Sequence, residues 1–169
     1  MNARTLPRRA DVIDGTDAGG RPVLLATLGV PLAQDAAVFA IDTAVESGGH
    51  LVIANVTALE PLRMSLTLGY DALEEFTPRV SGSLRKTVEL ARSLGVRVER
   101  LRVRSPRPLA ALVELVAEIR PGVLVFGPDR SALRSGRYRK AVRAIVERSE
   151  CLVWLPPDGT VAGSAGLAS

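Results

Sequence analysis

The residues of this chain best suited to chemistry form a basic cluster between Arg130 and Arg143, with no acidic residue among them. Guanidinium groups donate paired hydrogen bonds that match phosphate and carboxylate oxygens. The cluster follows an apolar run and precedes a helical pattern, so it lies at a helix start, where positive charge opposes the helix dipole at a cost of about 0.3–1 kcal/mol per group. An anion bound there would offset that cost. The members are Arg130, Arg134, Arg137, Arg139, Lys140 and Arg143.

Two other interpretations of this basic cluster stay open. A charged loop and helix start can simply be a solvated face of the protein, because Lys and Arg are mostly exposed. A nucleic-acid site would also use basic residues for phosphate contacts. Proteins that bind single strands add aromatic platforms for the bases, and Tyr138 is the only aromatic residue inside the cluster. Nucleic acid is therefore disfavoured as a partner.

The sequence contains no familiar catalytic or metal-binding pattern. His50 and Cys151 stand alone, without the ligand spacing of a metal site. The chain has no G-x-S-x-G nucleophile elbow and no G-x-G-x-x-G dinucleotide loop. We therefore predict no metal site, no catalytic residues and no enzyme activity.

Composition and charge restrict the class of protein. The 169 residues fit one domain, and 47% hydrophobic residues with only 4% aromatics favour an aliphatic core of the α/β type. The net charge of +4 is a mild excess. Residues 1–20 indicate a disordered tail, 21–157 the folded domain and 158–169 a flexible tail. No segment reads as a signal peptide or reaches the roughly 18 apolar residues of a membrane span, so we expect a cytoplasmic protein that contacts no membrane.

Apolar runs alternate with helical patterns along the folded part. Continuous apolar runs predict strands that are covered on both faces, and a run that carries arginines at 96–104 predicts a strand at the edge of the sheet. The alternation predicts a parallel sheet with helices on both faces. The buried strands are expected at 23–28, 51–56, 123–127 and 151–155, and the helices at 32–47, 80–94, 108–119 and 139–149. The stretch 57–75 reads as irregular.

A ligand in such a sheet binds beyond the carboxyl ends of the strands, near the point where the strand order reverses. The ends of the first and fourth strands are therefore the expected site. The first strand would supply the floor, a glycine after the fourth strand one wall, and the basic cluster the groups that hold an anion. The predicted residues are Thr27, Leu28, Gly29, Gly127, Arg130, Arg137, Arg139 and Lys140.

The last third of the folded part resembles the universal stress protein family. Gly127 ends the fourth strand, a long loop and a helix follow, and the segment closes on ERSECLVWLP. The resemblance extends over roughly 21–157 and implies a five-stranded parallel sheet of order 3-2-1-4-5. It also implies a homodimer formed largely through the last strand and, in many members, bound ATP.

The sequence departs from the pattern of the family's nucleotide-binding members, which is G-x2-G-x9-G-[ST]. Gly127 is kept, but Arg130 stands where the second glycine belongs, and Arg139-Lys140 replace the Gly-[ST] pair. Leu28 stands where the family has an aspartate near the adenosine. We therefore predict that ATP binding of the family type is lost and expect no cofactor.

Two functions follow from the resemblance and these departures. The first is a non-catalytic homodimeric binding module, with the two copies joined through Leu152 to Leu155. The alternative is a protein that binds a nucleotide or another phosphate-containing small molecule, ATP among the candidates, at the ends of the first and fourth strands.

Overall fold

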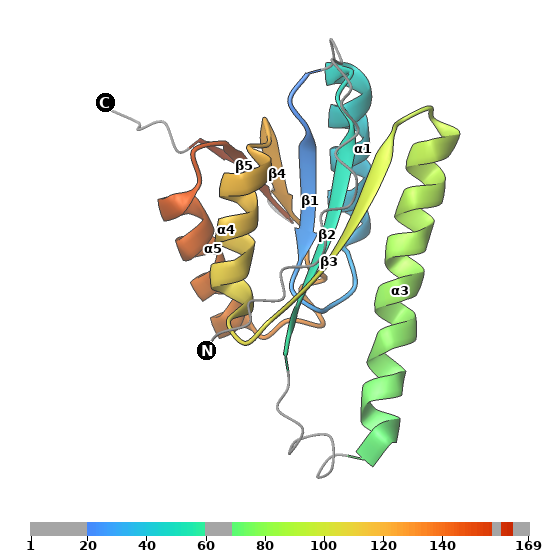
Figure 1. Cartoon of the computed structure of the whole chain (residues 1–169), viewed down its shortest axis with the longest axis vertical. Coiled ribbons are helices and arrows are strands. Elements are labelled where there is room, and N and C mark those ends of the chain that lie inside the picture. Colours follow the sequence, from blue (N-terminus) through green and yellow to red (C-terminus); the bar gives the residue numbers. More distant parts are fainter. Residues whose placement is uncertain (1–19, 60–68, 157–159, 164–169) are drawn as a thin grey trace, which may run out of the picture.

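Parallel strands form the centre of the molecule, and helices cover both faces of the sheet (Figure 1). The computed structural model describes residues 20–59, 69–156 and 160–163. Within them the strands lie in the order β3-β2-β1-β4-β5-β6, and the first five pair in parallel. The predicted five-stranded parallel sheet of order 3-2-1-4-5 is confirmed.

The bounds of the elements agree with the expected alternation of strands and helices. The strands are β1 (Val23–Thr27), β2 (Leu51–Ala58), β3 (Val98–Ser105), β4 (Val123–Phe126), β5 (Leu152–Leu155) and β6 (Thr160–Gly163). The helices are α1 (Gln34–Ser47), α3 (Gly69–Ser93), α4 (Pro108–Ile119) and α5 (Ser135–Arg148). No helix in the described part of the chain is long and apolar enough to cross a membrane.

Two apolar clusters hold the layers together, one on each face of the sheet. Helices α1 and α3 pack on one face through residues such as Ala40 and Leu84, and α4 and α5 pack on the other through residues such as Leu112 and Ile145 (Figure 1). Every residue of β1 is buried, because side chains on both of its faces meet a helix layer. This explains why β1 reads as a continuous apolar run.

The edge strand β3 changes its apolar face partway along. Val98 packs on the cluster under α1 and α3, whereas Leu101 and Val103 pack on the opposite cluster. Because side chains alternate between the faces of a strand, the arginines at 100, 102 and 104 lie on the same face as Val98. The predicted position of this strand at the edge of the sheet is confirmed.

The C-terminal stretch differs from the prediction. Residues 160–163, expected within a flexible tail, form β6, which pairs antiparallel with β5 from Leu152 opposite Gly163 to Leu155 opposite Thr160. Four small residues carry no readable alternation, and a strand of this kind is specified by backbone pairing with its neighbour. The edge of β5 that was predicted to pair with a second copy is therefore occupied by the same chain.

Two helices begin earlier than the sequence pattern indicated. Helix α3 begins at Gly69 rather than near residue 80, so it includes part of the stretch predicted to be irregular. Helix α5 begins at Ser135 rather than at Arg139. In both cases residues that disfavour helices, Pro78 and Gly136, lie in the early part and mask the pattern.

Candidate functional site

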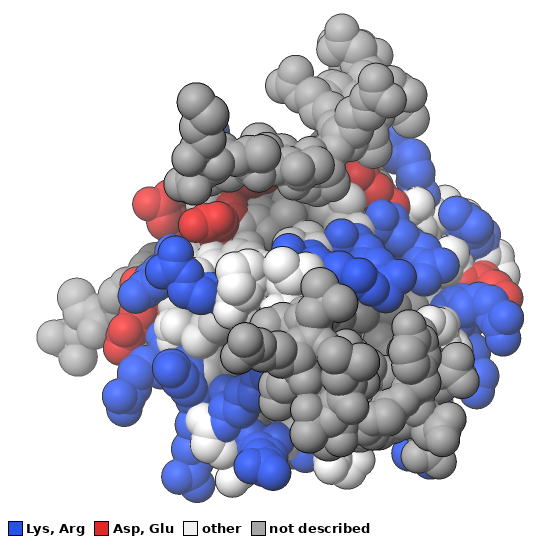
Figure 2. Space-filling model, turned by 60° about the horizontal axis from the view of Figure 1, so that its bottom comes forward, with Lys and Arg blue, Asp and Glu red and all other residues white. Residues whose placement is uncertain are grey.

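A cleft opens at the carboxyl ends of β1, β2 and β3, the edge of the sheet where ligands bind in α/β proteins. Its volume is about 900 Å³, and ligand sites have volumes of roughly 300–1,000 Å³. The lining comes from the β1–α1 turn, β2, β3, α3 and the loop and helix after β4. Lys and Arg side chains gather at this end of the molecule (Figure 2). The cleft is the candidate site.

The β1–α1 turn forms one wall of the cleft, and hydrogen bonds to side chains of β1 and β2 hold it in place. Gly29 has φ +70°, a left-handed conformation that favours glycine, and its N–H donates to Asn55 Oδ1 at 2.9 Å. The buried Thr27 hydroxyl donates to the Val30 carbonyl at 2.8 Å. Thr27 therefore shapes the turn from beneath, while Leu28 and Gly29 line the cleft.

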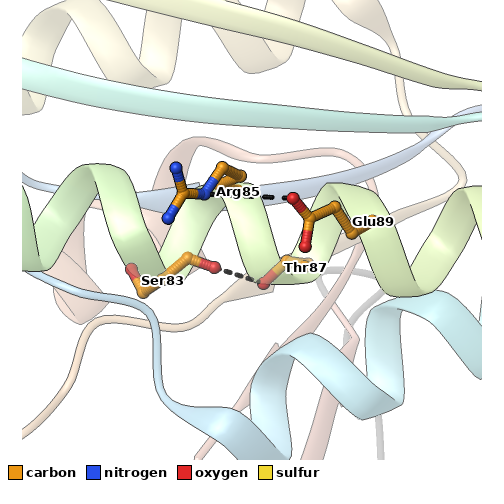
Figure 3. Close-up of polar contacts among 4 residues, drawn as sticks. All are labelled: Ser83, Arg85, Thr87 and Glu89. Carbon is orange, nitrogen blue, oxygen red and sulfur yellow. Dashed lines mark hydrogen bonds and ion pairs between the residues drawn. The ribbon is translucent and has the colours of Figure 1, made fainter.

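Helix α3 holds the far end of the same turn through a hydrogen bond. The Leu32 N–H donates to Ser83 Oγ at 3.1 Å, and the Ser83 hydroxyl in turn donates to the Val80 carbonyl at 2.9 Å. One turn later, Thr87 Oγ1 donates to the Ser83 carbonyl at 2.9 Å (Figure 3). The turn is thus fixed by β2 and α3 before any ligand arrives.

Replacing Asn55 by alanine should lower the free energy of unfolding by about 1–2 kcal/mol, because the partner of the Gly29 N–H is lost in a part-buried position. Chemical denaturation measures the loss. Asn55→Asp keeps an acceptor oxygen and should lose less. Equal stability of Asn55→Ala and the natural protein would show that Asn55 does not hold the turn.

Gly127, the predicted wall of the site, serves packing between β4 and α1. A Cβ at this position would lie 2.4 Å from Ala36 Cβ and 3.3 Å from Leu25 Cδ1, so only glycine fits without a shift of the helix. Its N–H donates to the Ala26 carbonyl at 3.0 Å, and its carbonyl accepts from the Ala33 N–H at 2.9 Å. Both backbone groups of Gly127 are therefore used by the fold.

Arg130, expected to hold an anion, packs on an aromatic ring. Its guanidinium carbon lies 3.8 Å from the ring centroid of Tyr138, a cation–π contact. The Tyr138 hydroxyl donates to the Pro156 carbonyl at 3.0 Å, and Asp129 Oδ1 accepts from the N–H and hydroxyl of Ser131. Arg130 is therefore engaged in closing the loop after β4.

The other three predicted basic residues separate around α5. Arg137 lines the cleft. Arg139 lies in a different, shallow depression beside Val142 and Arg143, and Lys140 is exposed. Of the predicted residues, the structure brings Leu28, Gly29 and Arg137 together at the cleft.

The sequence analysis gave a different role to three basic residues that line the cleft. Arg100, Arg102 and Arg104 on β3 line it together with Arg137, although the sequence pattern explained them only as protection of a sheet edge. Within 96–104 the apolar side chains move from one face of the strand to the other. The arginines are left on the face that α3 covers, where apolar residues are expected. This change of face is the signal that could have identified them. Asn55, hidden in an apolar run, was not predicted either.

Positive charge in the cleft is not neutralised by carboxylates of the described residues. Among the described residues, the lining contains four arginines and neither Asp nor Glu. None of the four forms an ion pair with a described acid. An ion pair that the described residues do form is Arg85 with Glu89 at 3.9 Å on α3, which is strongly exposed and contributes little to stability (Figure 3).

The remaining candidate groups lie apart from the cleft. Burial raises the pKa of the Cys151 thiol, so this side chain is a protonated, weakly reactive group at neutral pH. Within the described residues there is no group of three or more His, Cys, Asp or Glu that could hold a metal ion. The lining of the cleft instead offers guanidinium, amide and hydroxyl groups above apolar side chains.

Comparison with known proteins gives a consistent family and fold. The model of the universal stress protein family matches residues 20–156. A universal stress protein solved in complex with cAMP is 24% identical, with 82% of this chain and 97% of that chain covered and a TM-score of 0.53. One from Archaeoglobus fulgidus in complex with dAMP is 18% identical, with 80% and 97% covered and a TM-score of 0.54. UspA from Lactobacillus plantarum is 13% identical, with 82% and 99% covered and a TM-score of 0.60. No curated protein matches.

Proposed function

The chain belongs to the universal stress protein family, and from this premise we propose that it is a non-catalytic binding protein whose cleft holds a phosphate-containing small molecule of the nucleotide type. The observation that carries the proposal is the cleft with four arginines and no acid in its described lining. Similar folds have been solved with cAMP and with dAMP, which is consistent with a ligand of this class.

The mode of binding would differ from the one that the family motif implies. In that motif, glycines bring backbone N–H groups close to the phosphates. Here the backbone groups of Gly127 bond to Ala26 and Ala33, and Arg130 packs on Tyr138. Side-chain guanidinium groups of the cleft would therefore hold the phosphate, and the predicted loss of family-type ATP binding is part of the proposal.

The apolar part of the cleft would accept the base of the ligand. Val30, Ile53, Val80 and Leu84 contribute to the lining and are buried or nearly so. Ligand sites combine such an apolar wall with a few polar groups that fix the orientation. A base against these side chains and a phosphate beside Arg137 would use both kinds of surface.

A thermal shift with AMP tests this proposal. A ligand present at 100 times its Kd stabilises the native state by about 2.7 kcal/mol, which raises the Tm of a chain of this size by roughly 5–11 °C. Arg137→Gln should reduce the shift at equal AMP concentration. Arg139→Gln removes the same charge from outside the cleft and should not. No shift with millimolar AMP or Mg-ATP would contradict the proposal.

The predicted homodimer stays a prediction. Its expected contact, the edge of β5 from Leu152 to Leu155, is paired with β6 in this chain. A second copy would therefore have to join along the outer edge of β6 or by packing of faces. Light scattering of the full chain measures the mass in solution, and the mass of a single chain at high concentration would contradict a homodimer.

A further inference from the structure

We propose that the arginine row of β3 (Arg100, Arg102 and Arg104) forms a second anion subsite of the cleft, so that the preferred ligand is a nucleotide with two separated phosphate groups, one near Arg137 and one near β3. This inference rests on the proposed function and names the ligand class and the residues that select it.

The arginine row lies beside the structural support of the site. The register of the sheet places Arg100 opposite Ile53, Arg102 opposite Asn55 and Arg104 opposite Thr57. All three side chains project from one face of β3, and neighbours in the row are about 6.6 Å apart along the strand. They therefore present a line of guanidinium groups next to Asn55, the residue that holds the Gly29 turn.

Protection of a sheet edge accounts for charge on β3, since charged side chains deter pairing with another strand, but it does not require three arginines on one face. On β3 the three arginines share the face that carries the α1 and α3 core, and Glu99 projects from the opposite face. Like charges held side by side in a cleft repel one another, and an anionic ligand removes that repulsion.

The two basic regions approach the cleft from different sides. Arg137 comes from α5, whereas the arginine row comes from β3, which is separated from β1 by the whole width of β2. Adjacent strands are about 4.8 Å apart, so β1 and β3 lie roughly 10 Å apart. A ligand with a phosphate at each end can therefore contact basic groups that come from both sides of the cleft.

The dimensions of the cleft favour a small molecule over a nucleic-acid strand. Its volume of about 900 Å³ lies within the range of small-molecule sites. The described lining contains no aromatic side chain on which successive bases could stack. Apolar side chains between the two basic regions would hold one nucleoside.

Calorimetric titration with AMP and with adenosine 3′,5′-bisphosphate tests the inference. The natural protein should bind the bisphosphate at least tenfold more tightly than AMP. Arg102→Gln/Arg104→Gln should remove this preference and leave the Kd for AMP within about twofold, whereas Arg137→Gln should weaken both ligands. Arg143→Gln/Arg148→Gln removes the same two charges from the exposed side of α5 and should change neither Kd.

The outcomes separate this inference from the proposed function. Equal affinity for the two ligands, or an unchanged preference in Arg102→Gln/Arg104→Gln, overturns the second subsite and leaves the proposed function standing. Absence of binding by either ligand overturns the proposed function. A similar loss of preference in Arg143→Gln/Arg148→Gln overturns the assignment to the β3 arginines. Tighter binding of a single-stranded oligonucleotide than of the bisphosphate overturns the assignment to this ligand class. Arg102→Lys/Arg104→Lys, which keeps the charge, should retain part of the preference, and thermal melting verifies that each variant folds.

Discussion

Replacing Trp154 by alanine should lower the free energy of unfolding by about 3–5 kcal/mol, the largest loss that we expect from a single substitution. Trp154 is only 6% exposed and stacks on Phe39, with ring centroids 4.5 Å apart and planes inclined by 11°. The contact joins β5 to α1, so the substitution opens a cavity between the sheet and a helix. Denaturation followed by circular dichroism measures the loss, and the Tm should fall by roughly 6–20 °C.

A matched variant separates packing within one chain from packing between copies. Trp154→Phe keeps an aromatic ring against Phe39 and should lose clearly less stability than Trp154→Ala. The loss in Trp154→Ala should be the same at low and high protein concentration, because both rings belong to one chain. A loss that appears only at high concentration would contradict this contact and place Trp154 in an interface between copies.

Gly127→Val should lower the free energy of unfolding by about 3 kcal/mol in the absence of any ligand, since overpacking of a filled core costs about 1–3 kcal/mol and occasionally more. The reason is the approach of α1, whose Ala36 Cβ would lie 2.4 Å from a Cβ at position 127. Ala36 is itself fully buried and cannot move outward without moving the helix. Chemical denaturation of the ligand-free protein measures the effect.

Gly136→Ala is the control for Gly127→Val. Gly136 lies in the first turn of α5, and a Cβ there would meet nothing within 4 Å. Alanine in a helix is favoured over glycine by about 0.5–1 kcal/mol, so this variant should be equally stable or more so. If Gly127→Val instead folds with normal stability and loses only nucleotide binding, then Gly127 serves a ligand, as in the family motif, and not the packing of α1.

The parallel sheet could be predicted from local sequence patterns, whereas its strand order followed from the resemblance to the family. Runs such as 23–28 and 123–127 are apolar on both faces, which requires helices on both sides and therefore parallel strands. The edge position of β3 followed from its arginines. Strand β6 could not be found in this way, because residues 160–163 are specified by pairing with β5 rather than by their own sequence.

The candidate site was less predictable because its residues meet through the register of the sheet. Arg102 lies beside Asn55 only because β2 and β3 pair in a particular alignment, and no local pattern states that alignment. The sequence analysis assigned the basic role to the loop after β4, but Arg130 packs on Tyr138, and Arg139 and Arg143 lie in a separate depression beside α5. Arg137 alone reaches the cleft from that group.

A crystal structure of the protein soaked with AMP tests most directly whether the cleft between the Gly29 turn and β3 is a phosphate-ligand site. We predict the phosphate within hydrogen-bonding distance of the Arg137 guanidinium and the adenine against Val30 and Ile53. A phosphate held by backbone N–H groups in the loop between Gly127 and Gly136, away from β3, or an empty cleft at saturating AMP, would contradict it.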